Sequence, residues 1–232
     1  MKAKIYIFIF FLAVMSGCEC VPDIVTPKII SPDNYTNALI LNCIADRDIL
    51  LIESNDIPLL KKAEYTQPSN IYQKINSGSS YLRLIDEQSN LSLVNMPVQL
   101  DKLGWYTIIF YGYRFSAKSL ILKDTTSNSS SGTDAYFRFV HTSFDSGEFI
   151  FKLSGQSNFE DLIGFKSFTD LKKINSGIYK LELINPANGN EILEKNGINI
   201  ESNKIYNILL KGTSVTLQNK PLILDIISSQ KN

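Results

Sequence analysis

A segment of the chain occurs twice, and this repeat constrains the fold more than any other feature. Residues 74–78 (KINSG) recur as residues 173–177, ninety-nine positions later. Three further pairs of segments match in the same order: 81–85 with 179–183, 105–109 with 205–209, and 119–122 with 221–224. Because the order is kept and the offsets drift by only a few residues, we predict that one domain is duplicated in tandem.

Within each copy the apolar residues come in short runs that are bounded by Asn, Asp, Ser and Gly, which is typical of β-strands. About seven short strands per copy, without a long helical period, predict an all-β chain: two tandem immunoglobulin-like antiparallel Greek-key β-sandwiches after a lipoprotein signal peptide. We expect strands at 39–45, 49–53, 71–75, 81–85, 91–94, 105–111 and 120–123 in the first copy. In the second we expect them at 136–141, 149–153, part of 165–174, 179–184, 191–194, 205–211 and 222–227.

The first twenty residues have the pattern of an export signal. Lys2 and Lys4 precede ten consecutive apolar residues, 5–14. Such a run is typical of a signal peptide and is too short for a membrane-spanning helix, which needs about 20 apolar residues. The run ends in Met-Ser-Gly-Cys at 15–18, which resembles the bacterial lipobox. We therefore predict a signal peptide over 1–17 and a lipid anchor, palmitate included, at Cys18; the alternative is secretion with Cys18 left free.

The segments after the anchor differ sharply in composition. Residues 18–37 carry three prolines and predict an extended stalk. The first sandwich is expected over 38–123 and the second over 135–232. Residues 124–134 between them hold only Asp, Thr, Ser, Asn and Gly. We expect this segment to be a flexible linker that keeps the sandwiches adjacent without fixing the angle between them.

The composition argues against several classes of function. The 23 basic side chains are balanced by 23 acidic ones, so we expect no nucleic acid partner. One His and three Cys leave little material for a metal site, and we expect no metal and no cofactor. An exported protein meets oxidising surroundings, so a bridge between Cys20 and Cys43 is one possibility. Because Cys43 lies in an apolar strand pattern, a buried free thiol is favoured.

The candidate catalytic groups are few. His141, the single His, lies near Ser143 and Asp145, which is a combination found in nucleophilic sites. Residues two apart on a strand point to one face and cannot form the chain of hydrogen bonds that a triad needs, so a structural His is favoured. Arg138 shares a face with Val140, and we expect it to pair with an acidic neighbour.

Aromatic residues gather in the sixth expected strand of the first copy and just after it. Trp105 is a candidate sugar platform, but its counterpart in the repeat is Ile205, which favours core packing. Tyr111, Tyr113 and Phe115 follow closely. We expect them to form an exposed aromatic patch that, with Trp105, marks a possible binding surface.

The second copy resembles a bacterial family. Residues 138–145 (RFVHTSFD), the strand that follows and Gly155 are similar to the opening of the secreted family called domain of unknown function 4397. Residues 176–181 and 203–206 resemble that family's later strands. The similarity departs at Phe144, where the family has Pro, and the first copy keeps only the later pieces. The resemblance implies an immunoglobulin-like sandwich outside the cytoplasm, often on a lipid anchor. It assigns no role to Arg138, His141 or Asp145.

Two functions are compatible with the sequence. The first is a cell-envelope lipoprotein, lipid-anchored in the outer membrane on its periplasmic or surface face, that acts as a non-enzymatic binding or spacer module for an envelope protein or glycan. The second is a hydrolase acting on polysaccharide, or an accessory subunit of one. It requires two carboxylates that face each other across a cleft. Asp46, Asp48, Asp145 and Glu148, on equivalent loops of the two copies, are the candidates for these carboxylates.

Overall fold

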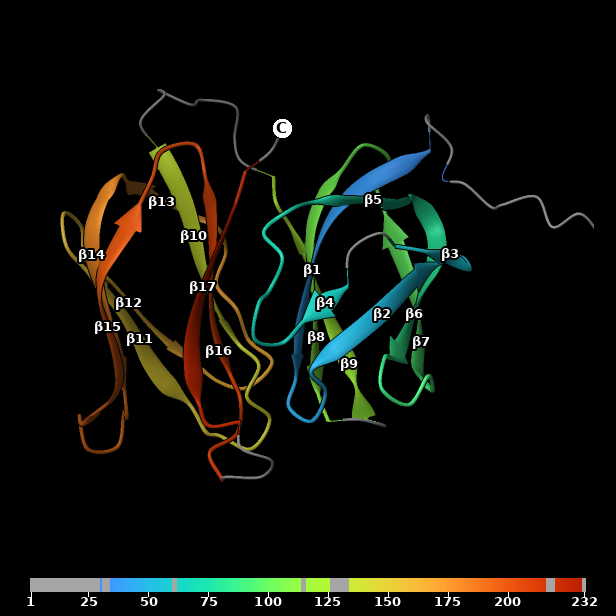
Figure 1. Ribbon diagram of the computed structural model, residues 1–232. Coiled ribbons are helices and arrows are strands. Elements are labelled where there is room, and N and C mark those ends of the chain that lie inside the picture. Colours follow the sequence, from blue (N-terminus) through green and yellow to red (C-terminus); the bar gives the residue numbers. More distant parts are fainter. Residues whose placement is uncertain are drawn as a thin grey trace, which may run out of the picture.

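The computed structural model describes residues 30, 34–59, 62–113, 116–125, 134–215 and 220–230, and these form β-strands and connecting loops without an α-helix. The all-β fold class is therefore confirmed. Within these ranges no helix has the length and apolar character needed to cross a bilayer. Figure 1 shows the two copies side by side, the first in blue to green and the second in yellow to red.

Each copy folds into two sheets, and all strands but one short strand of the first copy have a described counterpart in the second. In the first copy the sheet orders are β5-β1-β8-β9 and β3-β2-β6-β7, with β4 also paired to β2. In the second copy they are β13-β10-β16-β17 and β12-β11-β14-β15. The strands of the first copy are β1 (Tyr35–Ile44), β2 (Ile49–Ser54), β3 (Ile57–Pro58), β4 (Ala63–Glu64), β5 (Gln73–Asn76), β6 (Gly78–Asp86), β7 (Ser92–Leu100), β8 (Trp105–Gly112) and β9 (Lys118–Lys123). Those of the second are β10 (Asp134–His141), β11 (Phe149–Ser154), β12 (Phe159–Ile163), β13 (Lys172–Asn175), β14 (Gly177–Ile184), β15 (Glu191–Ile200), β16 (Ile205–Lys211) and β17 (Ile223–Ser229).

One strand pair in each copy is parallel, which an entirely antiparallel sandwich does not contain. The pairs are β1 with β8 and β10 with β16. A parallel pair needs a long crossover connection. Here the strands of the opposite sheet lie between the two paired strands in the chain, so they supply that crossover. All fourteen expected strands have a counterpart, whereas the short strands β3, β4 and β12 were not predicted.

Each copy has its own apolar core between its two sheets. In the first copy Ile40, Leu82 and Phe110 belong to this core, and in the second Phe139, Leu181 and Ile208 do. Strands of the outer sheets, such as β11, alternate buried and half-buried residues, as expected for strands with one face toward a core.

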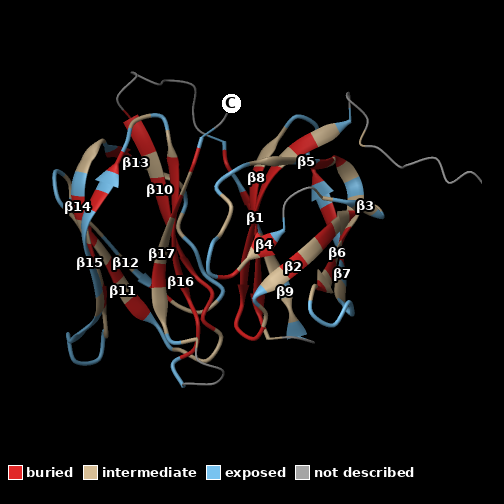
Figure 2. Cartoon of the chain, in the orientation of Figure 1, coloured by how far each residue is buried: buried red, intermediate tan, exposed pale blue. Residues whose placement is uncertain are grey.

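A third apolar cluster lies between the copies. β8 is buried along both faces: its even-numbered residues enter the core of the first copy, and the odd-numbered Ile109 and Tyr111 pack toward the second copy. The cluster joins the two inner sheets, and Figure 2 shows buried residues concentrated there. Its members are Leu39, Leu41, Cys43, Ile109, Tyr111 and Leu122 from the first copy and Val140, Leu209 and Ile227 from the second.

This interface corrects the expected role of the linker. Burying the facing sheets holds the copies in one orientation, since separating them exposes the whole cluster to water. The ends of the expected linker also belong to the folded unit. Asp134 begins β10, and Asp124, 0% exposed, donates its backbone N–H to the carbonyl oxygen of Trp105 at 2.8 Å.

The contacts across the interface are reciprocal. Tyr111 is the last but one residue of β8, and its ring meets that of Phe165 edge-on, with centroids 5.7 Å apart. Its counterpart Lys211 ends β16, donates a hydrogen bond to the carbonyl oxygen of Tyr65 and lies over the Tyr65 ring. Tyr65 follows β4 and Phe165 follows β12, and each of these strands lies at the edge of the outer sheet in its own copy. The two copies therefore pack by the same face, as the subunits of an isologous dimer do.

Candidate functional site

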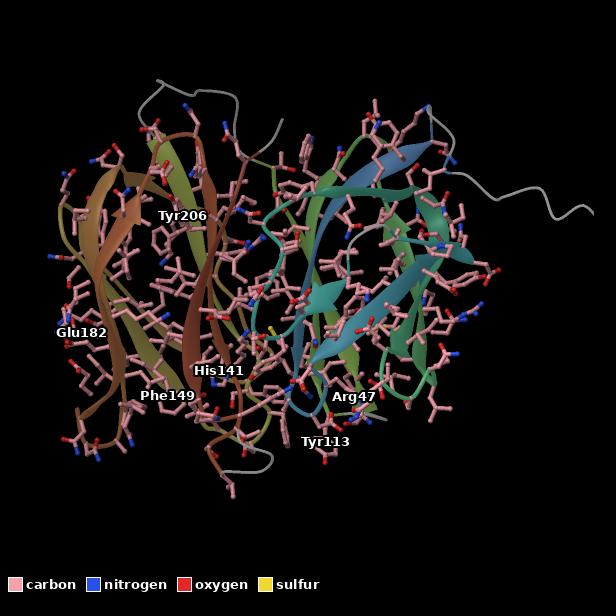
Figure 3. The ribbon with its side chains drawn as sticks, viewed as in Figure 1. Arg47, Tyr113, His141, Phe149, Glu182 and Tyr206 are labelled. Carbon is pink, nitrogen blue, oxygen red and sulfur yellow. The ribbon has the colours of Figure 1, made fainter. Side chains whose placement is uncertain are left out.

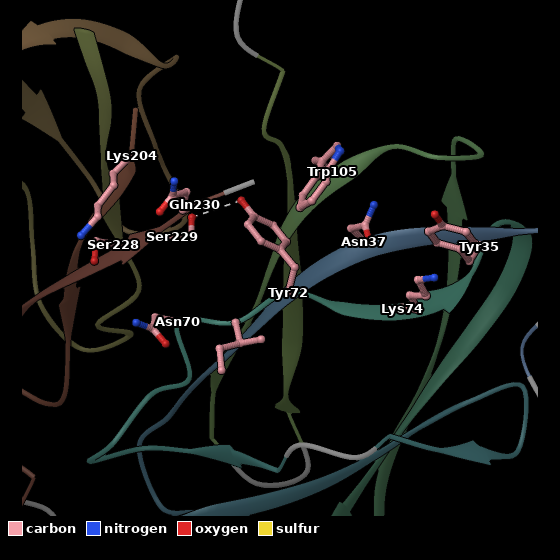
Figure 4. A pocket seen from close by; sticks show the side chains of 11 residues that line it. Tyr35, Asn37, Asn70, Tyr72, Lys74, Trp105, Lys204, Ser228, Ser229 and Gln230 are labelled. Carbon is pink, nitrogen blue, oxygen red and sulfur yellow. Dashed lines mark hydrogen bonds between the residues drawn. The ribbon is translucent and has the colours of Figure 1, made fainter. Parts of the chain in front are cut away.

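A cleft of about 510 Å³ opens where the two copies meet, at the end of the interface where β8 begins and β17 ends. Seven of its lining residues come from the first copy and four from the second, and Figure 4 shows the two groups facing each other. The lining holds three aromatic rings, three side-chain amides, two lysines, two serines and one Ile. These residues are Tyr35, Asn37, Asn70, Ile71, Tyr72, Lys74 and Trp105, with Lys204, Ser228, Ser229 and Gln230.

Trp105 and Tyr72 form the aromatic wall of this cleft. Their rings meet edge to face, with centroids 4.8 Å apart and planes at 85°. The backbone before Trp105 is fixed by hydrogen bonds, because the carbonyl oxygen of Gly104 accepts the Asn37 backbone N–H at 2.9 Å and the Thr36 hydroxyl at 3.0 Å. A side chain at Gly104 would lie 2.5 Å from the Tyr106 ring. Gly is therefore the residue that fits there without a shift of that ring, and the two hydrogen bonds fix the backbone next to Trp105.

The hydroxyl of Tyr72 connects the cleft to a buried polar network at the interface. It donates to Asp124 Oδ2 at 2.8 Å and lies 3.1 Å from Ser229 Oγ. Asp124 also accepts from the Thr107 hydroxyl at 2.8 Å and forms an ion pair with Arg138 at 2.5 Å. This pair joins the two copies, with Arg138 only 3% exposed. The network fixes the Tyr72 ring in the cleft wall.

Burial dominates the electrostatics of this network. It lowers the pKa of Arg138, and the neighbouring Asp124 opposes the effect. Burial also raises the pKa of Tyr72, with the Asp124 charge as the next contribution. The raised pKa agrees with a neutral Tyr72 hydroxyl that donates its proton to Asp124, and the contact between Arg138 and Asp124 balances the buried guanidinium charge.

The structure corrects the interpretation of Trp105 as a core residue. It belongs to none of the three apolar clusters and is half-buried on the cleft wall. Its counterpart Ile205 is buried, so the comparison between copies was misleading at this position. The odd-numbered face of β8 looks toward the other copy, and Trp105 is the first residue on it, where the interface ends and the cleft opens.

The expected aromatic patch does not exist as one surface. Tyr111 is 5% exposed and packs in the interface, which contradicts its expected exposure. It lies six residues from Trp105 along β8, a separation of about 20 Å in a strand. Tyr113 is half-buried at that far end, where its ring approaches Phe144 of the second copy at 6.0 Å. Phe115 lies outside the described residues.

His141 is a buried structural residue. Its Nε2 lies 2.8 Å from the carbonyl oxygen of Gly147, and its ring stacks on Phe149 at a centroid distance of 5.9 Å. Figure 3 shows it inside the second copy, beside Phe149. Burial lowers its pKa, which favours the neutral ring. The geometry agrees with the structural interpretation over the catalytic one.

Asp145 supports a loop. Its carboxylate accepts the backbone N–H groups of Ser214 at 2.8 Å and of Val215 at 3.1 Å. The hydroxyl of Ser143 lies 3.4 Å from the same carboxylate. In the part of the chain that the structure describes, no hydrogen bond joins this carboxylate to His141, so the three residues do not form a catalytic relay.

The acidic residue of the expected ion pair for Arg138 is Asp124. Arg138 faces the same side of β10 as Val140, as the alternation predicts, and Nε also donates to Asn207 Oδ1 at 2.7 Å. The acidic residue is no strand neighbour in the same copy. It directly follows β9 in the first copy, in the segment that was expected to be linker.

Three of the four carboxylates proposed for a hydrolase, Asp46, Asp48 and Asp145, are engaged in ion pairs or loop contacts, and Glu148 is exposed. Asp46 contacts the guanidinium of Arg47 at 3.1 Å, and Asp48 contacts Lys220 at 2.8 Å. A shallow hollow of about 280 Å³ holds Asp46 and Asp48 together with Asp86, which also contacts Arg47, at 3.4 Å. Among the described residues no group of three His, Cys, Asp or Glu side chains is placed to hold a metal ion.

Cys43 is a free thiol within the interface cluster. Burial raises its pKa to about 11. This agrees with the small buried hydrophobe that the strand pattern favoured. Cys20 and the predicted lipidation site Cys18 lie outside the described residues.

Comparison with family models gives no match to this chain, and comparison with curated proteins gives no relative. The resemblance to the domain of unknown function 4397 family therefore stays a prediction.

Sequence reasoning missed most of the cleft. Tyr72 and Lys74 lie far in the chain from Lys204, and the two groups meet only because the copies pack face to face. One signal was available: β1 and β8 are apolar on both faces, which is typical of strands covered on both sides. Such strands in a two-sheet domain indicate that a further layer covers the inner sheet.

Proposed function

We propose that this chain is a non-enzymatic lipoprotein of the cell envelope, anchored through Cys18 in the outer membrane, that binds a glycan in the cleft between its two copies. The observation that carries the proposal is the wall made by Trp105 and Tyr72, surrounded by amides and hydroxyls from both copies. The stalk and anchor position this cleft near the envelope surface.

The chemistry of the lining suits a sugar. Aromatic side chains offer a flat apolar face to the C–H side of a pyranose ring, and Trp offers the largest. Side-chain amides both donate and accept hydrogen bonds, which matches the hydroxyl groups of a sugar. Asn37, Asn70 and Gln230 supply such amides beside Trp105. A mostly preformed cleft with a few polar groups is the usual form of a small-ligand site.

The buried network makes the cleft rigid. The Arg138–Asp124 pair crosses the interface, and Tyr72 is hydrogen-bonded to Asp124 and next to Ser229. Both walls are thus held in place before a ligand arrives. Preorganisation of this kind lowers the entropy cost of binding.

Tryptophan fluorescence tests the proposal directly, because Trp105 is the single Trp of the chain. Titration with solubilised envelope or capsular polysaccharide is expected to change its emission, and calorimetry is expected to show saturable binding. Trp105→Ile introduces the residue found in the second copy and is expected to abolish binding while the fold is kept. Phe168→Leu removes an exposed aromatic ring away from the cleft and serves as the control. Binding that survives Trp105→Ile contradicts the proposal.

The alternative, a polysaccharide hydrolase or its accessory subunit, is distinguished by the same samples. Incubation of the protein with the bound polysaccharide and measurement of reducing ends reports turnover. A constant number of reducing ends over time agrees with binding alone, whereas a steady increase that is lost in a variant of Asp46 or Asp86 supports the alternative. The anchor is tested separately, since Cys18→Ala is expected to abolish incorporation of labelled palmitate.

A further inference from the structure

The cleft carries positive charge from both copies. Lys74 and Lys204 line it, and no Asp or Glu is among the described residues of the lining. Lys204 is largely neutralised, because its Nζ contacts Glu201 Oε1 at 2.9 Å. Lys74 is different: its Nζ lies over the Tyr35 ring, 4.1 Å from the centroid, and in the described part of the chain it forms no ion pair. Among the described residues, the lining therefore offers one ammonium group without an acidic partner.

The second copy gives an internal comparison for this lysine. The register of β1 with β5 and of β10 with β13 makes Lys173 the counterpart of Lys74, and Asp134 the counterpart of Tyr35. Lys173 is neutralised by Asp134, with Nζ and Oδ2 2.6 Å apart. The second copy therefore has Ile205 in place of Trp105, and the ion-paired Lys173 in place of Lys74. The first copy thus has both the indole ring of Trp105 and the ammonium group of Lys74, whereas the equivalent positions of the second copy have an aliphatic side chain and a neutralised lysine.

We propose that the ligand is a glycan that contains uronic acid, with one carboxylate bound by Lys74 and the sugar ring on Trp105. This inference rests on the proposed function and names the class of glycan. A single uncompensated lysine balances a monovalent anion, and a carboxylate on the pyranose ring brings that charge next to the aromatic wall. The cation–π contact with Tyr35 positions the ammonium group in the lining, and an ammonium group has three N–H donors that can bind a carboxylate.

The test compares one oligosaccharide in two forms. A galacturonate oligomer and its methyl ester have the same length and linkage, and differ only in the carboxylate charge. Calorimetry is run with each ligand against the full mature chain and against Lys74→Gln and Lys195→Gln. Lys195 is exposed on the outer strand β15, away from the cleft, and its variant is the matched control.

The acid is expected to bind about tenfold more tightly than the ester, which corresponds to the loss of one charged hydrogen bond. Lys74→Gln is expected to remove this difference, and Lys195→Gln to leave it unchanged. Added salt is expected to weaken binding of the acid and to leave that of the ester largely unaffected. Equal binding of acid and ester, both lost in Trp105→Ile, overturns the uronate inference and leaves the glycan proposal intact. Failure of both ligands and of the polysaccharides above overturns both.

Discussion

Asn207 Nδ2 donates a hydrogen bond of 3.4 Å to Thr107 Oγ1, and these two residues hold the same position in the two copies. A contact between equivalent residues is expected where a two-fold axis passes through an interface. Next to this contact the two copies differ in charge. Arg138 in the second copy faces Asp124 in the first, whereas their counterparts are Leu39 and Ser229.

The ion pair between Arg138 and Asp124 is expected to behave as a unit. Arg138→Leu leaves a buried, uncompensated carboxylate and is expected to lower the free energy of unfolding by about 3–5 kcal/mol. The double variant Arg138→Leu with Asp124→Ser introduces the residues of the opposite copy and is expected to recover most of that loss. Urea unfolding measures both. A double variant as unstable as the single one contradicts this interpretation of the network.

Stability is expected to fall as the pH decreases from about 7.5 to 5.5 because of His141. Its folded-state pKa is lowered by burial, whereas the unfolded chain protonates it near the ordinary value of 6.5. The unfolded state therefore binds more protons below pH 6.5, and the free energy of unfolding decreases there by no more than about 1.4 kcal/mol per pH unit. His141→Gln is expected to flatten this dependence. The same slope in the variant rules out His141 as its source.

The labelling rate of the Cys43 thiol is expected to report how often the interface opens. In a chain with Cys18→Ser and Cys20→Ser it is the last thiol. Its pKa is raised to about 11 from 9.0, which lowers the thiolate fraction by about 100-fold, and its burial adds steric protection. Labelling with a thiol reagent at pH 8 is expected to be slow in the folded chain, and faster in Arg138→Leu. Labelling as fast as that of a free cysteine argues against a closed interface.

The strands were predictable and the interface was not, for a physical reason. A strand is recognised from local alternation and turn residues, so β2, β11 and β16 were found within a residue or two. The cleft depends on which sheet faces of the two copies meet, and equivalent residues of the copies are about a hundred positions apart in the chain. Asp124 illustrates the difference: a lone Asp at the start of a polar segment is typical of a linker, and its burial becomes favourable through Arg138, Tyr72 and Thr107, which are distant in the chain.

The partial symmetry also explains why the repeat misled the interpretation of Trp105. Equivalent positions share a fold but not an environment, because the two copies contribute different side chains to the interface. Lys74 and Lys173 show the same divergence. Comparison between copies therefore predicted strand positions well and site residues poorly.

The central claim, that the two copies form one unit through their inner sheets, is tested most directly by cutting the chain between them. A site for a sequence-specific protease is placed within residues 126–133, and the cleaved protein is analysed by size-exclusion chromatography and native mass spectrometry at micromolar concentration. The two halves are expected to stay associated as a one-to-one complex and to separate only on unfolding. Two folded halves that elute separately would contradict the claim, and with it the cleft as a preformed site.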